Sequence, residues 1–273
     1  MNIKLLVIPI AICLSSMAAL ADASVITWQA SQDLFTGTAN DQSVVDTSFG
    51  NFVLGVNATD AATAAATASV TANGVVFTNI DAADIVNTGA GFTSNGVTLT
   101  STAQRENQGA FQTGSVGAGP IGDLITGAHF DAATWTFAGL TPGDTYQFQI
   151  FTNDARGGTG QGGRDTNWNV GFSDGVAAFD PNAPVATSNL NNRDPVNLMG
   201  EQSGDFIIGE FIADATGTQS FQFQGTREGF PSTAGGQGQI NALQLRVVEA
   251  VPEPSSLLVL SLGSLFLVKR RRS

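Results

Sequence analysis

Apolar and polar residues alternate along several short stretches of the chain. The clearest is Thr145-Tyr146-Gln147-Phe148-Gln149-Ile150, where every second residue is apolar. The same alternation occurs in residues 135–137, 221–223 and 243–247. A repeat of two residues is typical of a β-strand that has one face on a core and the other in water. These stretches therefore predict half-buried strands.

Other predicted strands are separated by glycine and proline, which favour turns. They cover residues 25–29, 51–56, 75–80, 96–101, 167–172 and 205–213. Ile240 and Ala242 have the opposite parity to Leu243 and Leu245, which predicts a bulge near Asn241. Many short strands without a long helical pattern favour an all-β fold, a two-sheet antiparallel jelly-roll sandwich.

One stretch of low complexity differs from the rest. Residues 57–72 are rich in alanine and threonine, with Thr59, Thr63, Thr67 and Thr71 four residues apart. In a helix these threonines would form a slowly drifting row, which suggests an ice-binding surface. We favour the alternative, a polar surface insertion that is partly helical or frayed.

The N-terminus has the three parts of a secretory signal peptide. A short n-region that contains Lys4 precedes an apolar core from Leu5 to Leu14, and small residues then lead to a cleavage site after Ala21 or Ala23. We favour Ala23, because a predicted strand follows at once. The apolar core is shorter than the ~20 residues that a membrane span needs, so a retained anchor is the weaker alternative. The predicted units are a signal peptide (1–23), a β-sandwich domain (24–250) and a C-terminal tail (251–273).

The tail has three parts in a fixed order. Pro252-Glu253-Pro254 precedes an apolar run at 257–268, and Lys269-Arg270-Arg271-Arg272 follows it. The basic cluster holds that end in the cytoplasm and leaves the preceding domain outside. As a helix, the run would be roughly 18 Å long against a ~30 Å hydrocarbon core. This short helix favours a transient anchor that is later processed, with a permanent anchor as the alternative.

This tail resembles the PEP-CTERM sorting signal, which also ends some ice-binding proteins. The resemblance implies a membrane protease of the exosortase type as partner, cutting near Pro252-Glu253-Pro254. It implies an exported protein of the cell envelope, cell surface or extracellular matrix, with contact to the membrane only through the tail.

The body resembles another group of proteins along three pieces of sequence. Residues 135–146, 206–221 and 239–246 are similar to the galactose-binding-like jelly rolls of exported planctomycete and verrucomicrobial proteins. This resemblance implies a fold and does not transfer a ligand.

Charge excludes several kinds of partner. Residues 24–250 contain 21 acidic residues, 6 arginines and no lysine, a net charge of −15. This field repels phosphate backbones, so we expect no nucleic-acid partner. The one cysteine, Cys13, lies in the signal peptide, so the domain has neither disulfides nor thiolate ligands. We expect no cofactor, although the many acidic residues leave room for a structural calcium ion bound by oxygens.

No catalytic residue can be selected from the sequence. His129, the only histidine, precedes a predicted strand and suggests a structural or surface role. Residues 171–175 match the string Gly-x-Ser-x-Gly, but no histidine follows Ser173, so we interpret the match as a turn. A glycoside hydrolase needs a specific pair of carboxylates, and nothing distinguishes one pair among the acids. We therefore predict that the protein is not an enzyme.

The strongest candidate for a ligand site is the glycine-rich loop that follows residue 152. It offers charged and amide groups for sugar hydroxyls and an aromatic ring for stacking. The candidate residues are Asp154, Arg156, Arg164, Asp165, Asn167 and Trp168. A weaker candidate is the segment from Arg227 to Pro231. The alternative is a mobile hairpin whose acid–arginine pairs only close its stem.

These observations favour a surface or matrix protein that binds carbohydrate, with exopolysaccharide as the expected partner. The first alternative is a structural matrix protein without a ligand pocket. An ice-binding protein is a weaker alternative, and a polysaccharide lyase or hydrolase is weaker still.

Overall fold

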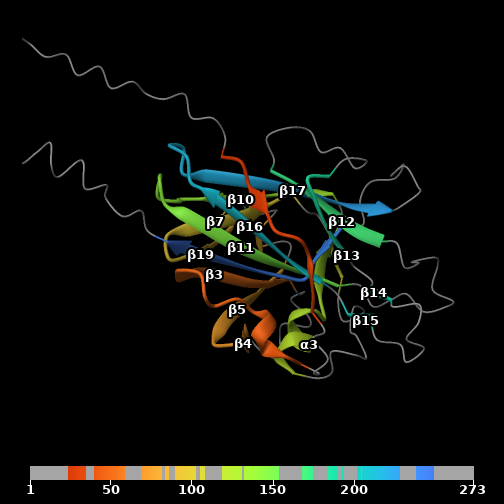
Figure 1. Cartoon of the computed structure of the whole chain (residues 1–273). Helices are drawn as coiled ribbons and strands as arrows, with labels where there is room; N and C mark the ends of the chain where they lie inside the picture. The colour runs from red at the N-terminus through yellow and green to blue at the C-terminus, as the bar shows by residue number, and fades with distance from the viewer. Residues whose placement is uncertain are drawn as a thin grey trace, which may run out of the picture.

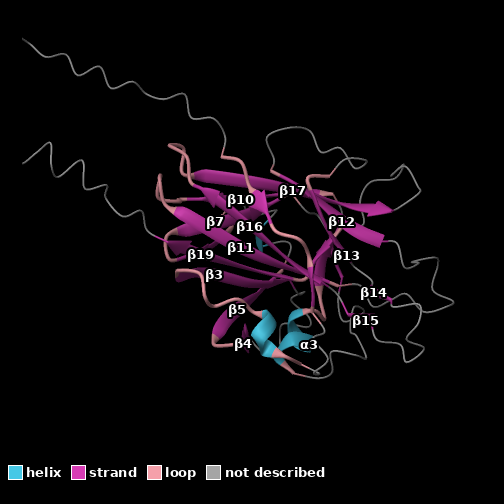
Figure 2. Ribbon diagram, in the orientation of Figure 1, coloured by secondary structure: helices cyan, strands magenta, loops and turns pink. Residues whose placement is uncertain are grey.

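The structure is a computed structural model. It describes residues 24–34, 40–58, 69–81, 84–85, 90–102, 105–107, 119–130, 132–153, 168–174, 184–189, 192–193, 202–203, 205–227 and 238–248. Strands dominate this part of the chain, and the helical turns lie beside β4 (Figure 2). The predicted all-β sandwich is therefore confirmed.

One layer, called sheet A here, contains eight strands in the order β1-β16-β11-β19-β3-β5-β4, with β2 also paired to β16. Its strands are β1 (Thr27–Trp28), β2 (Gln32–Asp33), β3 (Asn51–Ala58), β4 (Ser69–Ala72), β5 (Val75–Ile80), β11 (Thr145–Thr152), β16 (Asp205–Ile212) and β19 (Ala242–Val248). Among the described pairings of both layers, β3–β5 alone is parallel, and the others are antiparallel as predicted.

The second layer, sheet B, contains six strands in the order β13-β12-β17-β10-β7-β6. Its strands are β6 (Phe92–Ser94), β7 (Val97–Ser101), β10 (Ala133–Ala138), β12 (Trp168–Ser173), β13 (Ala186–Asn189) and β17 (Thr218–Arg227). Gly171, Phe172 and Ser173 of the string Gly-x-Ser-x-Gly are the last residues of β12. Gly175 lies outside the described residues, so the turn that we predicted at this string stays a prediction.

Smaller elements complete the described part. They are β8 (Arg105–Asn107), β9 (Ala128–Phe130) and β18 (Gln239–Ile240) in a three-stranded sheet, β14 (Asn192–Arg193) with β15 (Gln202–Ser203), the 3-10 helix η1 (Gln42–Val44) and the helix α3 (Pro120–Leu124). The chain passes from β18 to β19 at Asn241. Ile240 and Leu243 face the main core while Ala242 faces the other side of sheet A, so the parity changes at Asn241 as predicted. The register shift in the pairing of β19 with β3 lies instead between Leu245 and Arg246.

The main core lies between the two sheets and is aromatic. Phe148 of sheet A stacks on Phe221 of sheet B with ring centroids 5.1 Å apart, and Trp135 and Phe137 are fully buried beside them. Offset and edge contacts of this kind add about 0.5–1.5 kcal/mol per pair beyond the buried area. The alternating aromatic residues thus fix the faces on which the sheets meet.

Two short turns establish which strand ends lie together. Residues 139–144 connect β10 to β11, and residues 213–217 connect β16 to β17, so each turn crosses between the sheets. The turns bond to each other, since Gly143 N–H donates to the Ala213 carbonyl (2.8 Å) and Leu140 N–H to the Gly217 carbonyl (3.0 Å). We call this the turn end of the sandwich. The opposite strand ends, at Thr152, Trp168 and Arg227, form the loop end.

Both limits of the described chain lie at the turn end. Val248 pairs with Thr145, which follows the first turn, and the Ser24 hydroxyl donates to Gln219 in the second residue of β17. Figure 1 shows the red and dark-blue ends of the ribbon on the same side of the domain.

The outer face of sheet A is covered, unlike the half-buried strands that alternation predicted. Gln147, Gln149, Gln244 and Arg246 occupy polar positions of β11 and β19, and all four are buried. Residues 41–50 cross this face and provide its hydrogen-bond partners. Next to this segment lies a second apolar cluster, in which α3 packs against β4 and Phe151 lies under Phe77. The prediction of one solvated face was wrong for these two strands.

The alanine- and threonine-rich stretch is described only at its ends. Residues 57–58 complete β3 and residues 69–72 form β4, which pairs with β5. Thr71 therefore lies in a strand and not in the helix or frayed insertion that we considered. Thr59, Thr63 and Thr67 lie outside the described residues.

Candidate functional site

The predicted carbohydrate-binding loop begins and ends at the loop end of the sandwich. Asn153 follows β11 in sheet A, and Trp168 begins β12 in sheet B. Trp168 pairs with Arg227, the last residue of β17. The end of the first predicted loop is thus adjacent to the start of the second. Asp154, Arg156, Arg164, Asp165 and Asn167 lie outside the described residues, and Trp168 is described through its backbone alone.

A buried asparagine fixes the strand ends beneath this region. The Asn241 Oδ1 atom accepts from the backbone N–H of Asn153 (2.6 Å), and its Nδ2 atom donates to the carbonyls of Gly127 (2.7 Å) and Ile125 (3.2 Å). Its own carbonyl accepts from Ala58 N–H at 2.7 Å. Through its side chain and its backbone, Asn241 therefore links four segments of the chain, and Asn153 is held in a defined position.

His129 lies in the interior beside the main core. It belongs to β9, is fully buried and has Trp135 as a ring neighbour at 6.0 Å. Burial lowers the pKa of the imidazole to about 4, although the Ile80 backbone and the Asp81 carboxylate act in the opposite direction. Within the described residues, neither ring nitrogen meets the geometric criteria for a hydrogen bond, and the Ile80 backbone is near enough only to raise the pKa. The ring is neutral at pH 7 and shielded from any substrate in solution.

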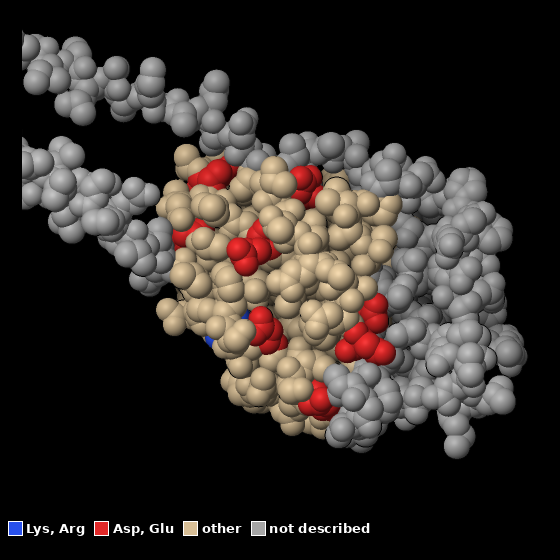
Figure 3. Space-filling model, in the orientation of Figure 1, with Lys and Arg blue, Asp and Glu red and all other residues tan. Residues whose placement is uncertain are grey.

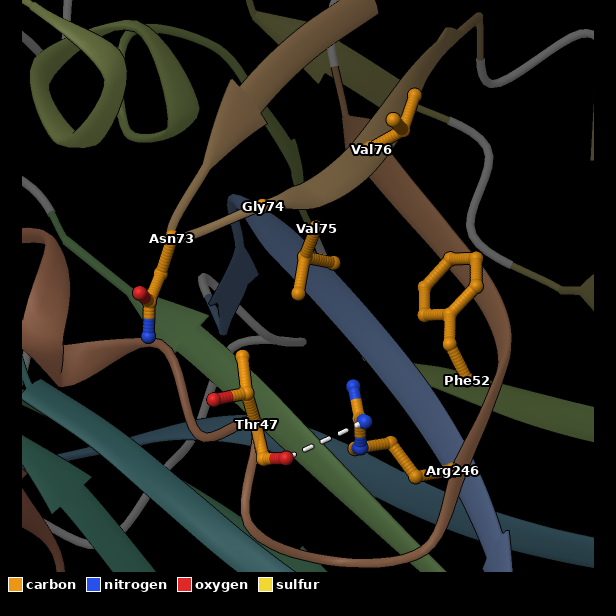
Figure 4. A pocket seen from close by; sticks show the side chains of 7 residues that line it. All are labelled: Thr47, Phe52, Asn73, Gly74, Val75, Val76 and Arg246. Atoms are coloured by element: carbon orange, nitrogen blue, oxygen red, sulfur yellow. Dashed lines mark hydrogen bonds between the residues drawn. The ribbon is translucent and has the colours of Figure 1, made fainter.

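A pocket of about 360 Å³ lies at the outer face of sheet A, at a site that the sequence did not reveal (Figure 4). Its lining residues come from the segment before β3, from β3, from the β4–β5 turn and strand β5, and from β19. They are Thr47, Phe52, Asn73, Gly74, Val75, Val76 and Arg246. The Phe52 ring and the Arg246 guanidinium lie across the opening from Asn73 and Val75. The pocket thus combines an aromatic face, aliphatic walls and one cation.

Arg246 is held in place by backbone carbonyls. Its Nε donates to Phe49, and its Nη2 donates to Gly50 (3.0 Å) and to Thr47 (3.4 Å). Burial lowers the pKa of Arg246, and the charge of Asp46 partly offsets this effect. Arginine is so strongly basic that the guanidinium remains protonated at neutral pH although its pKa is lowered. The pocket therefore contains a fixed positive charge.

The surface around these features is acidic. Acidic side chains are scattered over the face seen in Figure 3, while basic side chains barely reach the surface there. Within the described ranges, no three His, Cys, Asp or Glu side chains lie close enough together to hold a metal ion. Nor does the described part of the chain contain a helix that is long and apolar enough to cross a membrane; the predicted anchor at 257–268 lies outside it.

The sequence signal for the pocket was weak. Arg246 is one of six arginines in a domain without lysine, and it occupies a polar position of an alternating strand. Alternation alone indicates a solvated side chain there. Only the contact with Thr47, almost two hundred residues earlier, converts the position into the wall of a pocket.

Comparison with known proteins identifies the tail. Residues 250–272 match the family model described as the PEP-CTERM protein-sorting motif. This match confirms the motif predicted from Pro252-Glu253-Pro254 and the basic cluster, and it implies export and sorting to the cell envelope by an exosortase. No curated protein and no solved structure shows significant similarity to the chain.

Proposed function

We propose that the protein is a non-catalytic surface protein whose β-sandwich binds carbohydrate at the loop end, with exopolysaccharide as its natural partner. The pairing of Trp168 with Arg227 carries this proposal. It brings the end of the first predicted loop beside the start of the second, and the sequence concentrates charged, amide and aromatic groups in these two segments. Such a combination suits sugar hydroxyls and the apolar faces of sugar rings.

The position of Val248, the last described residue before the tail, supports the same function. The described chain ends at Val248, at the turn end of the sandwich. Strands of eight residues at about 3.3 Å each separate the two ends by roughly 25 Å. A protein attached through its tail would thus turn its loop end away from the membrane and towards extracellular polymers.

The environment of His129 supports a role without catalysis. A general base must reach the proton that it abstracts. His129 is the only histidine of the chain, and it is enclosed in the core with a lowered pKa. The domain is therefore proposed to bind glycans without cleaving them.

An array of glycans and exopolysaccharides tests the proposal with the full chain in mild detergent. We expect Arg156→Ala and Arg164→Ala each to lower retention about tenfold, since a hydrogen bond from a charged donor contributes about 1.5–3 kcal/mol. Melting temperatures should stay unchanged. The matched pair Asp165→Ala and Asp214→Ala removes one carboxylate from the predicted loop or from the turn end, and only the first should affect retention.

The same array distinguishes the alternatives. Repeating it with calcium and with a chelator tests for a structural calcium ion, and assaying the retained glycans for new reducing ends tests for hydrolysis. If the two arginine variants are retained as well as the parent chain, the loop is not the binding site. If no glycan retains the parent chain in either condition, the domain is a structural matrix component.

A further inference from the structure

The pocket around Arg246 is the second region with the means to bind a ligand, and it is separate from the loop end. Arg246 points to the outer face of sheet A, where its register neighbours are Gln147 on β11 and Phe52 on β3. The pocket lining contains one cation and no acidic side chain. In a domain of net charge −15, this local positive charge stands out from its surroundings.

Part of the Arg246 guanidinium remains available to bind a ligand. Arginine has five N–H donors in a planar fork. Three carbonyls engage Nε and Nη2, and no partner within the described residues accounts for Nη1. Nη1 is not fully enclosed, so solvent reaches it. Because the three carbonyls hold the guanidinium in place, an anion that binds to it does not have to order a flexible side chain.

The neighbouring carboxylate does not neutralise Arg246 by contact. The Asp46 carboxylate accepts hydrogen bonds from the Ser48 N–H (2.8 Å) and the Ser48 hydroxyl (2.7 Å). It acts on the guanidinium through space alone. A cation that is largely buried without a contacting anion is incompletely compensated, because backbone carbonyls provide dipoles and not a charge.

The remaining walls define the shape of the ligand. Phe52 and Val76 are partly exposed at 36% and 46%, and they present apolar surface beside the guanidinium. Asn73 and Thr47 add polar atoms at the rim (Figure 4). A volume of about 360 Å³ lies at the lower limit of small-molecule pockets, which is roughly 300 Å³. The space suits one ring-sized ligand with a charged group at one side.

We propose that this pocket binds a sugar carboxylate, that is, one uronic acid unit. The carboxylate accepts from Arg246, and the C–H face of the sugar ring packs on Phe52. Hydroxyl groups reach the polar rim at Asn73 and Thr47. The pocket accommodates one carboxylate, because its lining contains one cation.

Titration calorimetry of the full chain in mild detergent at low salt tests the proposal with D-galacturonate and D-glucuronate, and with D-galactose and D-glucose as neutral counterparts. We expect the uronates to bind at least tenfold more tightly than the neutral sugars. Raising the salt to 0.5 M should weaken uronate binding, since the attraction is electrostatic. Tri-galacturonate identifies the source of the ligand: if it binds as well, the site reads a unit of a polymer, and if it does not, the site takes the free sugar acid.

Two variants assign the binding to this pocket. Arg246→Lys keeps the charge and loses the planar fork, so we expect uronate affinity to fall at least tenfold. Because Arg246 also holds carbonyls, a second variant leaves it intact: Val76→Trp fills the mouth of the pocket and should abolish uronate binding. Ile212→Trp is the matched control, since Ile212 is an exposed residue of the same sheet (59%) outside the pocket, and it should bind normally. Equal binding of galactose and galacturonate, or unchanged uronate affinity in Val76→Trp, would overturn the proposal.

Discussion

Sheets A and B carry the same alternation of apolar and polar residues, yet their outer faces differ. In β10 of sheet B the inward residues Trp135 and Phe137 are buried, while Thr134 and Thr136, which alternate with them, remain partly exposed. In β11 of sheet A the polar residues Gln147 and Gln149 are as buried as the aromatic residues beside them.

Hydrogen bonds explain how sheet A can be covered. The Gln149 side chain donates to the Val44 carbonyl (2.7 Å) and accepts from the Asp46 N–H (3.0 Å) and from Gln244 (2.7 Å). Gln244 in turn donates to the Asp46 carbonyl (2.8 Å). The glutamine side chains of sheet A thus provide the hydrogen bonds that water would otherwise make with residues 41–50. This segment has few backbone hydrogen bonds of its own. A polar face can be buried when nearly every polar atom finds a partner.

Sheet B has no such arrangement on its described outer face. There the polar side chains bond to each other across strands, as Thr136 does with Ser220 at 2.8 Å. Such pairs contribute about 0.2–1 kcal/mol. We therefore expect substitutions at equivalent sequence positions to have unequal effects on the stability of the two sheets.

The largest difference is expected between two glycines with positive φ. Gly50 ends the covering segment at φ 40°, and a Cβ there would overlap the Val247 carbonyl oxygen and lie 2.6 Å from its carbon. Gly143 lies in an open turn at φ 88° with nothing within 4 Å of a Cβ. We expect Gly50→Ala to cost about 4 kcal/mol, from steric overlap and backbone strain, and Gly143→Ala about 1 kcal/mol from strain alone.

Urea unfolding of both variants measures these values. The test depends on the difference between them, because any general cost of alanine at positive φ affects both. Equal destabilisation would mean that the covering segment is not held tightly against β19, and the contrast between the two outer faces would lose its basis.

A smaller difference is expected between two glutamines. Gln149→Ala leaves the Val44 carbonyl and the Asp46 N–H without partners in a buried position, and should lower the free energy of unfolding by about 3 kcal/mol. Gln222 lies on the partly exposed face of sheet B, with one long contact to Ser173 at 3.5 Å, so Gln222→Ala should change stability by less than about 0.5 kcal/mol.

Hydrogen exchange adds a structural readout to the glutamine pair. The Asp46 amide should exchange faster in Gln149→Ala and unchanged in Gln222→Ala, because the Asp46 N–H donates to Gln149. If stability falls by the same amount in both variants, the glutamines of sheet A do not hold the covering segment.

The sequence predicts the main strands because their signal is local. Residues 145–150 alternate strictly, and the parity change at Asn241 marks the passage from β18 to β19. The covered face could not be predicted in this way. Gln149 bonds to residues more than a hundred positions away, and alternation is identical for a polar residue in water and one bonded to a crossing segment. The parallel pairing of β3 with β5 is equally non-local.

The two candidate sites differ in the same way, because one was selected from local residue types and the other depends on contacts between distant segments. The loop residues Arg156 and Arg164 were selected by residue type, and they remain predictions because they lie outside the described residues. The pocket at Arg246 depends on Phe52 and Asn73, which no pattern connects with it. Residue types indicate which groups are available for binding, whereas the position of a pocket depends on contacts between distant segments.

His129 occupies a third kind of polar position. It is buried, and its ring nitrogens have no hydrogen-bond partner within the described residues. Its pKa is about 4 in the folded protein and 6.5 when exposed. Between these values the unfolded chain binds a proton that the folded chain does not, so stability is full above pH 6.5 and falls as the pH is lowered towards 4. The loss from this group is about 2 kcal/mol at pH 5 and about 3 kcal/mol at pH 4.

Unfolding of the parent chain and of His129→Leu, each measured between pH 7.5 and 4.5, isolates this effect. Both proteins share the titration of the carboxylates, so the difference between their curves belongs to His129. We expect the leucine variant to gain about 2 kcal/mol relative to the parent between pH 7.5 and 5, because an apolar side chain in this site has no proton to exclude. Parallel curves would mean that the imidazole gains a proton in the folded state, and that an acceptor within the core, as in the glutamine network of sheet A, satisfies it.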